Sequence, residues 1–159
     1  MKKLIRLQVN GEAHELAVNP DETLLQVLRG QLDLIGPKKG CDSGGCGCCT
    51  VELDGKAIYA CMKYAASADG GEITTAEGLS QDGELHVIQQ AFVDAGAVQC
   101  GYCTCGMMMA ARQLVDTVEN PGEDEIRQAI SGNLCRCTGY VNIVKAVQHA
   151  AATTDRDGE

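Results

Sequence analysis

The chain has 159 residues, of which 45% are hydrophobic, and this length allows one large domain or two small ones. Its formal net charge of −9 argues against a nucleic-acid-binding protein, because phosphates attract basic surfaces. No run approaches the roughly 18 apolar residues of a membrane-spanning helix, and no export signal follows Met1, so we expect a cytoplasmic protein.

Cysteine is the most informative residue type in this composition. The chain has ten cysteines, whereas aromatic residues, which usually supply much of the area buried in a core, make up only 3%. A cytosolic chain so rich in cysteine more often binds metal than forms disulfides. We therefore expect metal sites to help hold the fold together.

Segments of alternating hydrophobicity predict a sheet in the first half. Asn10-Gly11 and Asp54-Gly55 each separate two such segments, which is a strong hairpin signal. A helix is expected after Asp21, where leucine and valine recur on one side. The expected strands cover 4–9, 13–18, 50–53, 56–60 and 73–75, and a loop rich in glycine and cysteine covers 36–49.

The second half has the periodicity of helices. An Asn120-Pro121-Gly122 break separates the second helix from the third. The pattern as a whole predicts an α+β protein, with a small α+β domain at 1–79 and a four-helix domain at 80–159. The four helices are expected at 84–97, 107–118, 123–130 and 140–152, the third of them starting at Glu123-Asp124-Glu125.

One group of cysteines, the first set, has the spacing of a plant-type [2Fe–2S] ferredoxin, Cys-x4-Cys-x2-Cys followed by a more distant cysteine. Two bridged irons need four thiolates, and a glycine-rich loop can supply three while turning backbone N–H groups towards sulfur. Cys48 offers an alternative to Cys49, although the spacing favours Cys49 and leaves Cys48 as a small buried hydrophobe. The first set is Cys41, Cys46, Cys49 and Cys61.

Another group, the second set, consists of two close pairs, each at the junction of predicted helices. Two such loops at one end of a bundle could enclose a second [2Fe–2S] cluster. Zinc remains an alternative, although a Cys-x-Cys pair is less usual for zinc. Cys105 could replace Cys103, but Cys-x2-Cys is the better chelate. The second set is Cys100, Cys103, Cys135 and Cys137.

Three stretches together resemble the small iron–sulfur subunit of molybdenum hydroxylases, the xanthine oxidase family. They are Gly40–Val51, Gln99–Thr104 and Gly132–Tyr140, and the resemblance covers nearly the whole chain. It implies a β-grasp, ferredoxin-like domain followed by a four-helix domain. It also implies that all eight cysteines of the two sets are cluster ligands.

The resemblance further implies an electron relay with no catalytic residue of its own. Electrons would pass singly from molybdopterin on a large subunit, through the second-set and then the first-set cluster, to FAD on a medium subunit or to another acceptor. These three chains would form a heterotrimer. Gln99 matches the family position that touches the pterin at the subunit interface. Rival interpretations are a free-standing two-cluster carrier and a redox sensor.

Two residues depart from the family pattern. Cys48 stands where alanine is usual, and Cys105 stands where proline is usual. The scattered histidines have no metal-ligand spacing, and Met107, Met108 and Met109 are expected to pack in the core.

Overall fold

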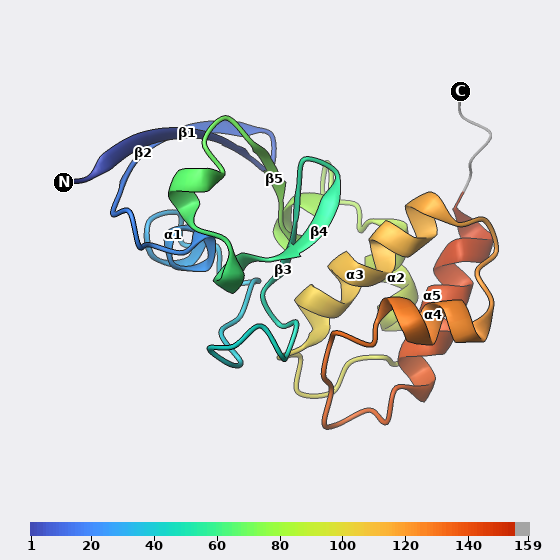
Figure 1. The fold of residues 1–159 in the computed structure, drawn as a ribbon. Helices are drawn as coiled ribbons and strands as arrows, with labels where there is room; N and C mark the ends of the chain where they lie inside the picture. Colours follow the sequence, from blue (N-terminus) through green and yellow to red (C-terminus); the bar gives the residue numbers. More distant parts are fainter. Residues whose placement is uncertain (155–159) are drawn as a thin grey trace.

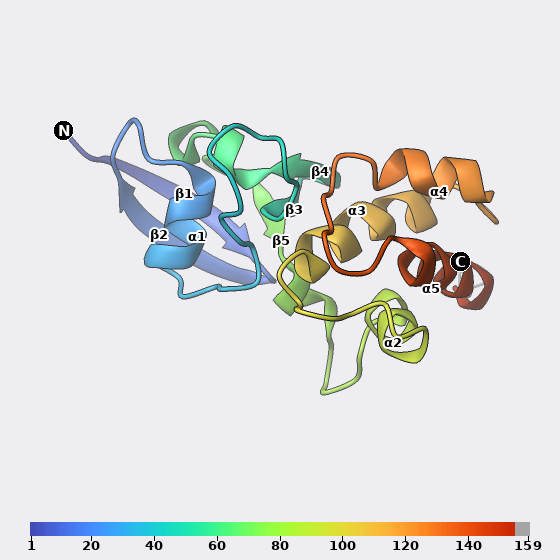
Figure 2. The same ribbon diagram turned by 90° about the horizontal axis from the view of Figure 1, so that it is seen from below.

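The computed structural model describes residues 1–154 and is built from a five-stranded sheet and five α-helices (Figure 1). The sheet with α1 lies to one side and helices α2 to α5 to the other, as the turned view also shows (Figure 2). Within the described residues, no helix is long and apolar enough to cross a bilayer. The elements are β1 (Lys3–Val9), β2 (Glu12–Val18), α1 (Leu24–Gly30), β3 (Thr50–Leu53), β4 (Lys56–Tyr59), β5 (Glu72–Thr74), α2 (Val87–Asp94), α3 (Thr104–Thr117), α4 (Glu123–Ala129) and α5 (Val141–Thr153).

The sheet has the order β2-β1-β5-β3-β4, and its only parallel pair among the described strands is β1 with β5. Both predicted hairpins are present. Asn10 and Gly11 have φ of 51° and 83°, and Asp54 and Gly55 have φ of 50° and 75°. Positive φ at both central residues gives the turn twist that suits a two-residue hairpin, and glycine adopts it without strain.

Helix α1 covers one face of the sheet because its apolar residues recur on one side. A capping box starts it: the Thr23 side chain accepts from the Gln26 N–H, and the Gln26 side chain accepts from the Thr23 N–H. Its buried residues join those of the strands in one hydrophobic cluster, the sheet core. Helix and strands contribute, among others, Leu24, Leu25, Val27, Leu28, Ile5, Leu7, Val9, Val51 and Ile73.

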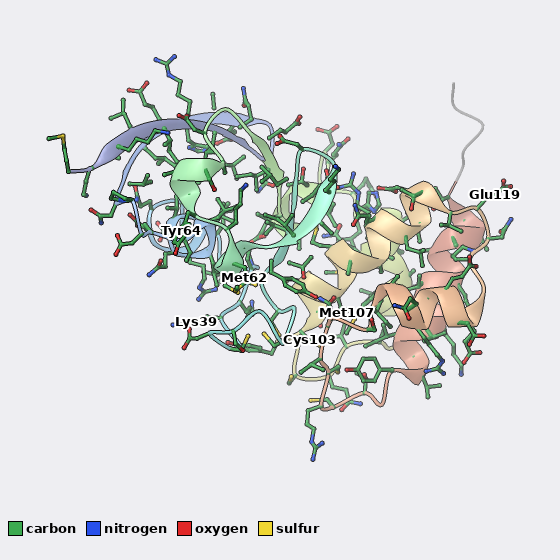
Figure 3. All side chains as sticks on the ribbon, viewed as in Figure 1. Lys39, Met62, Tyr64, Cys103, Met107 and Glu119 are labelled. Atoms are coloured by element: carbon green, nitrogen blue, oxygen red, sulfur yellow. The ribbon has the colours of Figure 1, made fainter. Side chains whose placement is uncertain are left out.

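Two short 3-10 helices, η1 (Ala60–Met62) and η2 (Ala65–Ser67), connect β4 to β5. The first of them carries Cys61, which was expected just after a strand extending to Ala60. Met62 and Tyr64, labelled in Figure 3, are 63% and 57% exposed on this connection. The connection therefore brings a cysteine to the surface beside two large exposed side chains.

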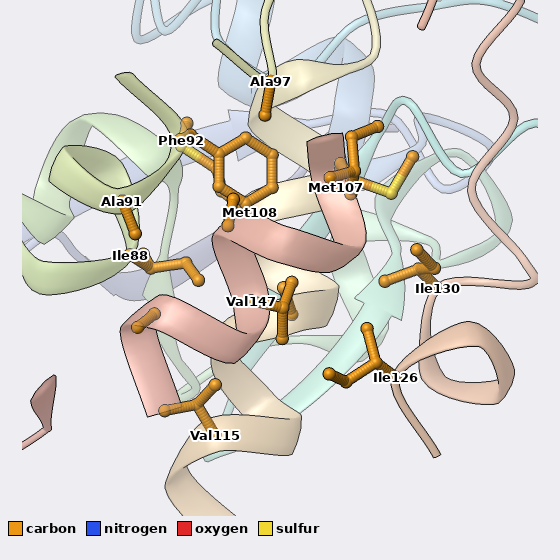
Figure 4. Packing of buried hydrophobic residues seen from close by; sticks show 14 of the residues in the cluster. Ile88, Ala91, Phe92, Ala97, Met107, Met108, Val115, Ile126, Ile130 and Val147 are labelled. Carbon is orange, nitrogen blue, oxygen red and sulfur yellow. The ribbon is translucent and has the colours of Figure 1, made fainter. Parts of the chain in front are cut away.

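The helical half has its own hydrophobic core, which Figure 4 shows from close by. Phe92 of α2 packs with Met107 and Met108 of α3, and all three are buried. Met109 is 2% exposed, so the three methionines pack in the core as predicted. Methionine fills irregular gaps, which suits a chain with a single phenylalanine.

The starts of α2 and α3 each differ by three residues from the predicted ones. Helix α2 begins at Val87 rather than Glu84, because Gln81 and Glu84 pair in a turn and His86 then caps the helix through Nδ1, which accepts from the Ile88 N–H. Helix α3 begins at Thr104, three residues before the apolar run that had marked its start.

The chain passes between the two cores along the 3-10 helix η3 (Ala76–Leu79). Ala76 and Leu79 pack in the helical core although both precede the predicted division at residue 79/80. That division stays a prediction, and 155–159 lie outside the described residues.

Helix α3 packs directly on strands β3 and β4. Arg112 Nη1 lies 3.2 Å from Glu52 Oε2 across this junction, with both side chains largely buried. The Gln113 side chain accepts from the Ala57 N–H and donates to the Gly55 carbonyl. These two bonds give partners to backbone groups at the open edge formed by β4. These contacts fix how the two halves sit against each other, and hence how their cysteines face.

Candidate metal centres

The first set lies in the loop between α1 and β3, with Cys61 added from η1. Cys46 and Cys49 are buried, whereas Cys41 and Cys61 are half-buried. Gly44 and Gly47 have φ of +71° and +69°, which lets the loop turn tightly around its thiols. The thiols interact in two pairs, Cys41 with Cys46 and Cys49 with Cys61.

Backbone N–H groups converge on the first set. The Cys41 sulfur accepts hydrogen bonds from the backbone N–H groups of Ser43, Cys46 and Gly45. These bonds, together with the interaction with the Cys46 thiol, lower the pKa of Cys41 to about 6. Burial raises the pKa of Cys49 to about 12. Cluster ligands bind as thiolates, so occupancy of this site must release the proton that burial holds on Cys49.

The second set comes from the segment before α3 and from the loop between α4 and α5. The Sγ atoms of Cys100 and Cys137 lie 3.5 Å apart, and both residues are exposed. Cys103 and Cys135 are half-buried, and their thiols also interact with each other. This set therefore has the same arrangement of two thiol pairs as the first.

The α4–α5 loop is held by Tyr140, whose hydroxyl accepts from the Cys135 N–H at 2.8 Å and donates to the Asn133 carbonyl at 3.2 Å. Tyr140 has a φ of 68°, an uncommon conformation for a large side chain. The Thr138 hydroxyl lies 3.1 Å from the Cys135 sulfur. These contacts keep the Cys-x-Cys pair turned towards Cys100 and Cys103.

The donors suit a two-iron cluster better than a single ion. All ten cysteines are free, and among residues 1–154 no three His, Cys, Asp or Glu side chains are grouped around one metal position. A [2Fe–2S] cluster instead takes two thiolates on each of two irons, which matches two thiol pairs in each set. The convergent N–H groups also suit an anionic cluster.

A seam of hydrogen bonds joins the two sites directly. Asn133, which is 3% exposed, donates through Nδ2 to the Gly47 carbonyl at 2.9 Å and to Thr50 Oγ1 at 3.2 Å. The Leu134 N–H donates to the Cys46 carbonyl at 2.9 Å. We call these contacts the Asn133 seam. Residue patterns alone assigned no separate role to Asn133, although its place two residues before Cys135 was the available signal.

We expect Asn133→Ala to lower the free energy of unfolding by about 1–2 kcal/mol, because the Gly47 carbonyl and Thr50 hydroxyl lose a buried donor. Asn142→Ala is the control, since the Asn142 side chain donates to the Gly96 carbonyl at the surface. Denaturant unfolding of both variants measures the difference. If the two variants unfolded at the same denaturant concentration, the Asn133 seam would have no special role in stability.

Gln99 is exposed at the mouth of the second set, directly before Cys100. Large apolar side chains on the two segments that carry the second set are also exposed. We call this surface the second-set face, and its exposed apolar residues are Val98, Tyr102, Leu134 and Val141.

Two protein-family descriptions match the chain. "2Fe-2S iron-sulfur cluster binding domain" matches residues 7–79, and "[2Fe-2S] binding domain" matches residues 75–148. Each half therefore matches a domain that binds a [2Fe–2S] cluster.

Similar proteins share nearly the whole chain. "Nicotinate dehydrogenase small FeS subunit" of Eubacterium barkeri is 46% identical over 94% of this chain and 95% of its own length. A chain of quinoline 2-oxidoreductase from Pseudomonas putida 86 superposes with a TM-score of 0.94 at 41% identity, covering 99% of this chain and 98% of that one. Aldehyde oxidoreductase of Megalodesulfovibrio gigas is 45% identical over 92% of this chain, but over only 16% of its own length.

Proposed function

Because the chain belongs to the family of small iron–sulfur subunits of molybdenum hydroxylases, which carry two [2Fe–2S] clusters, we propose that its two cysteine sets hold them in series. The chain is an electron-transfer subunit of an oxidoreductase, with the ferredoxin-like and helical domains of that family. Each cluster, when bound, accepts and passes on one electron. The protein supplies thiolates, N–H donors and a fixed separation.

The observation that carries the series arrangement is the Asn133 seam. It joins the loop of the first set to the loop of the second set through backbone and side-chain hydrogen bonds. The two clusters would then be neighbours within one rigid junction. A carrier with unrelated sites would have no need of such a junction.

We propose that the second-set face docks on the large molybdopterin subunit. Its thiols Cys100 and Cys137 are exposed, and apolar side chains around them mark an interaction surface. In the Megalodesulfovibrio gigas relative, the matching part is a small fraction of a longer chain, which supports close contact with a larger unit. Gln99 would then contact the pterin.

At the other end, we propose that electrons leave from the first set to FAD on a medium subunit or to another acceptor. Ile35, Met62 and Tyr64 are large apolar side chains exposed on the half that carries this set, and Lys39 and Met62 lie on the same side of the molecule in Figure 3. We also propose a cytoplasmic location, which ten free thiols support because a reducing compartment preserves them.

We expect Gln99→Ala in the assembled complex to slow substrate-driven reduction of the second-set cluster about tenfold, the effect of losing one good hydrogen bond at the contact. Iron content and both cluster signals should stay as in the wild type, because Gln99 is not a ligand. Rapid-mixing absorbance with substrate measures the rate. Gln90→Ala, on the exposed side of α2, is the control.

The proposed order of electron flow is tested by freezing the native complex at successive times after mixing it with substrate. The second-set cluster should be reduced before the first-set cluster. Reduction of the first-set cluster first would contradict the proposed order. Purification of the chain without any molybdenum-containing partner would contradict the assembly.

A further inference from the structure

Acidic residues are missing from the two segments of the sequence that carry the second set. The chain has 22 Asp and Glu residues, yet none of them occurs in 95–115 or in 126–154. The first segment contains Cys100 and Cys103, and the second contains Cys135 and Cys137. The negative charge of the chain, −9 in total, is therefore carried by other parts of the sequence.

The same two segments contain cations, and some of these have no partner in the chain. The guanidinium nitrogens of Arg112 and Arg127 lie 3.2 and 2.6 Å from carboxylate oxygens. Arg136 is exposed, and it is the only arginine within 1–154 whose guanidinium binds no other described residue. Lys145 is also exposed and follows Val141 by four residues on α5, so both lie on one side of that helix.

The loop that presents Arg136 is held in place on both sides of it. Arg136 lies between Cys135 and Cys137, and the Cys135 N–H donates to the Tyr140 hydroxyl at 2.8 Å. The Tyr140 N–H in turn donates to the Thr138 hydroxyl at 3.2 Å. Docking of a partner on Arg136 therefore requires little further ordering of this loop, which favours binding.

The exposed apolar residues of the second-set face share these two segments with Arg136. Arginine and aromatic residues together are typical of the residues that contribute most to protein–protein binding. A partner that covered Leu134 and Tyr102 would also remove water from Arg136. A cation that loses its water needs an opposite charge, so the partner must place an anion against the guanidinium.

We propose that the second-set face docks on an acidic patch of the large molybdopterin subunit, with the Arg136 guanidinium paired to a carboxylate of that subunit. The planar guanidinium binds a carboxylate through two parallel N–H···O bonds, so the pair fixes orientation as well as affinity. The carboxylates on other parts of this chain repel such a patch, which selects the docking orientation. This inference rests on the proposed function, which makes the large subunit the neighbour of the second set.

The first test weakens the pair in the assembled complex. Arg136→Gln should weaken binding of this chain to the large subunit about tenfold to a hundredfold, the effect of losing one hydrogen-bonded charge pair. Size-exclusion chromatography of the diluted complex at rising sodium chloride measures the released fraction. Salt should weaken the wild-type complex more steeply than the Arg136→Gln complex, because salt screens charge pairs. Arg6→Gln is the control, because it removes the same charge from an exposed arginine on β1.

The second test identifies the opposing group as a carboxylate. A carbodiimide joins an amine directly to a carboxylate, without a spacer. In the complex that carries Arg136→Lys, it should link the introduced amine to an Asp or Glu of the large subunit. Mass spectrometry of the digested complex locates the link.

Four outcomes would overturn the proposal. Binding by Arg136→Gln as tight as that of the wild type would show that no pair forms. An intact Arg136→Lys complex without a link from the introduced amine to the large subunit would exclude a carboxylate there. Unchanged binding with a shifted potential of the second-set cluster would show that the charge acts on the cluster. Loss of iron from Arg136→Gln would trace weaker binding to the cluster. A wild-type chain without any molybdenum-containing partner would instead refute the proposed function itself.

Discussion

Cys103→Ala is expected to halve the iron of the chain, from four to two atoms, and to abolish the signal of the second-set cluster. Cys103 is half-buried, and its thiol pairs with that of Cys135, so no solvent ligand reaches the vacated position easily. The rate of substrate-driven reduction of the acceptor should fall at least about a hundredfold, because the electron path loses its first cluster. Iron and sulfide analysis with spectroscopy measures the loss.

Cys105→Ala is the matched control for this ligand prediction. Cys105 lies two residues after Cys103, as the second residue of α3, and packs against the helical core. That variant should retain four irons and both signals. If Cys105→Ala lost the cluster and Cys103→Ala kept it, Cys105 would be the ligand that the sequence had left as an alternative.

Gly106→Ala is expected to lower the free energy of unfolding by about 3 kcal/mol, the upper part of the range for overpacking a filled core. A methyl group there would collide with the Gly47 carbonyl and press on the Cys48 backbone. Because Gly47 and Cys48 lie between the proposed ligands Cys46 and Cys49, the first-set cluster should also become labile. Denaturant unfolding and the rate of bleaching of cluster absorbance measure both effects.

Gly30→Ala is the control for Gly106→Ala. A Cβ on Gly30 would meet nothing within 4 Å, and its φ lies outside the positive range. We expect that substitution to change stability by about 0.5 kcal/mol or less. A Gly106→Ala variant as stable as Gly30→Ala would mean that α3 does not press on the first-set loop.

Local rules were sufficient for much of the fold. The hairpin at Asn10-Gly11 follows from a turn that needs positive φ, and the α1 face follows from leucine and valine at helical spacing. Helix starts at Val87 and Thr104 were missed because a histidine cap and a turn, rather than hydrophobic periodicity, set them.

The sequence predicted which cysteines belong to each set, but not how the cysteines pair within a set or how the two sets contact each other. Cysteine spacing grouped the thiols because chelation by a loop is a local property. It could not show that Cys100 pairs with Cys137, since that contact depends on how α3, α4 and α5 pack. Nor could it show Asn133 reaching Gly47, because a long-range hydrogen bond leaves no local pattern.

We propose that electron transfer through this chain depends on two neighbouring [2Fe–2S] clusters, one in each cysteine set. Electron paramagnetic resonance of the fully reduced native complex, with iron counted on the same sample, detects both clusters at once. We predict two distinct signals, each integrating to one spin per chain, with broadening from their mutual coupling. A single signal, with two irons per chain, would mean that one of the two sets binds no cluster.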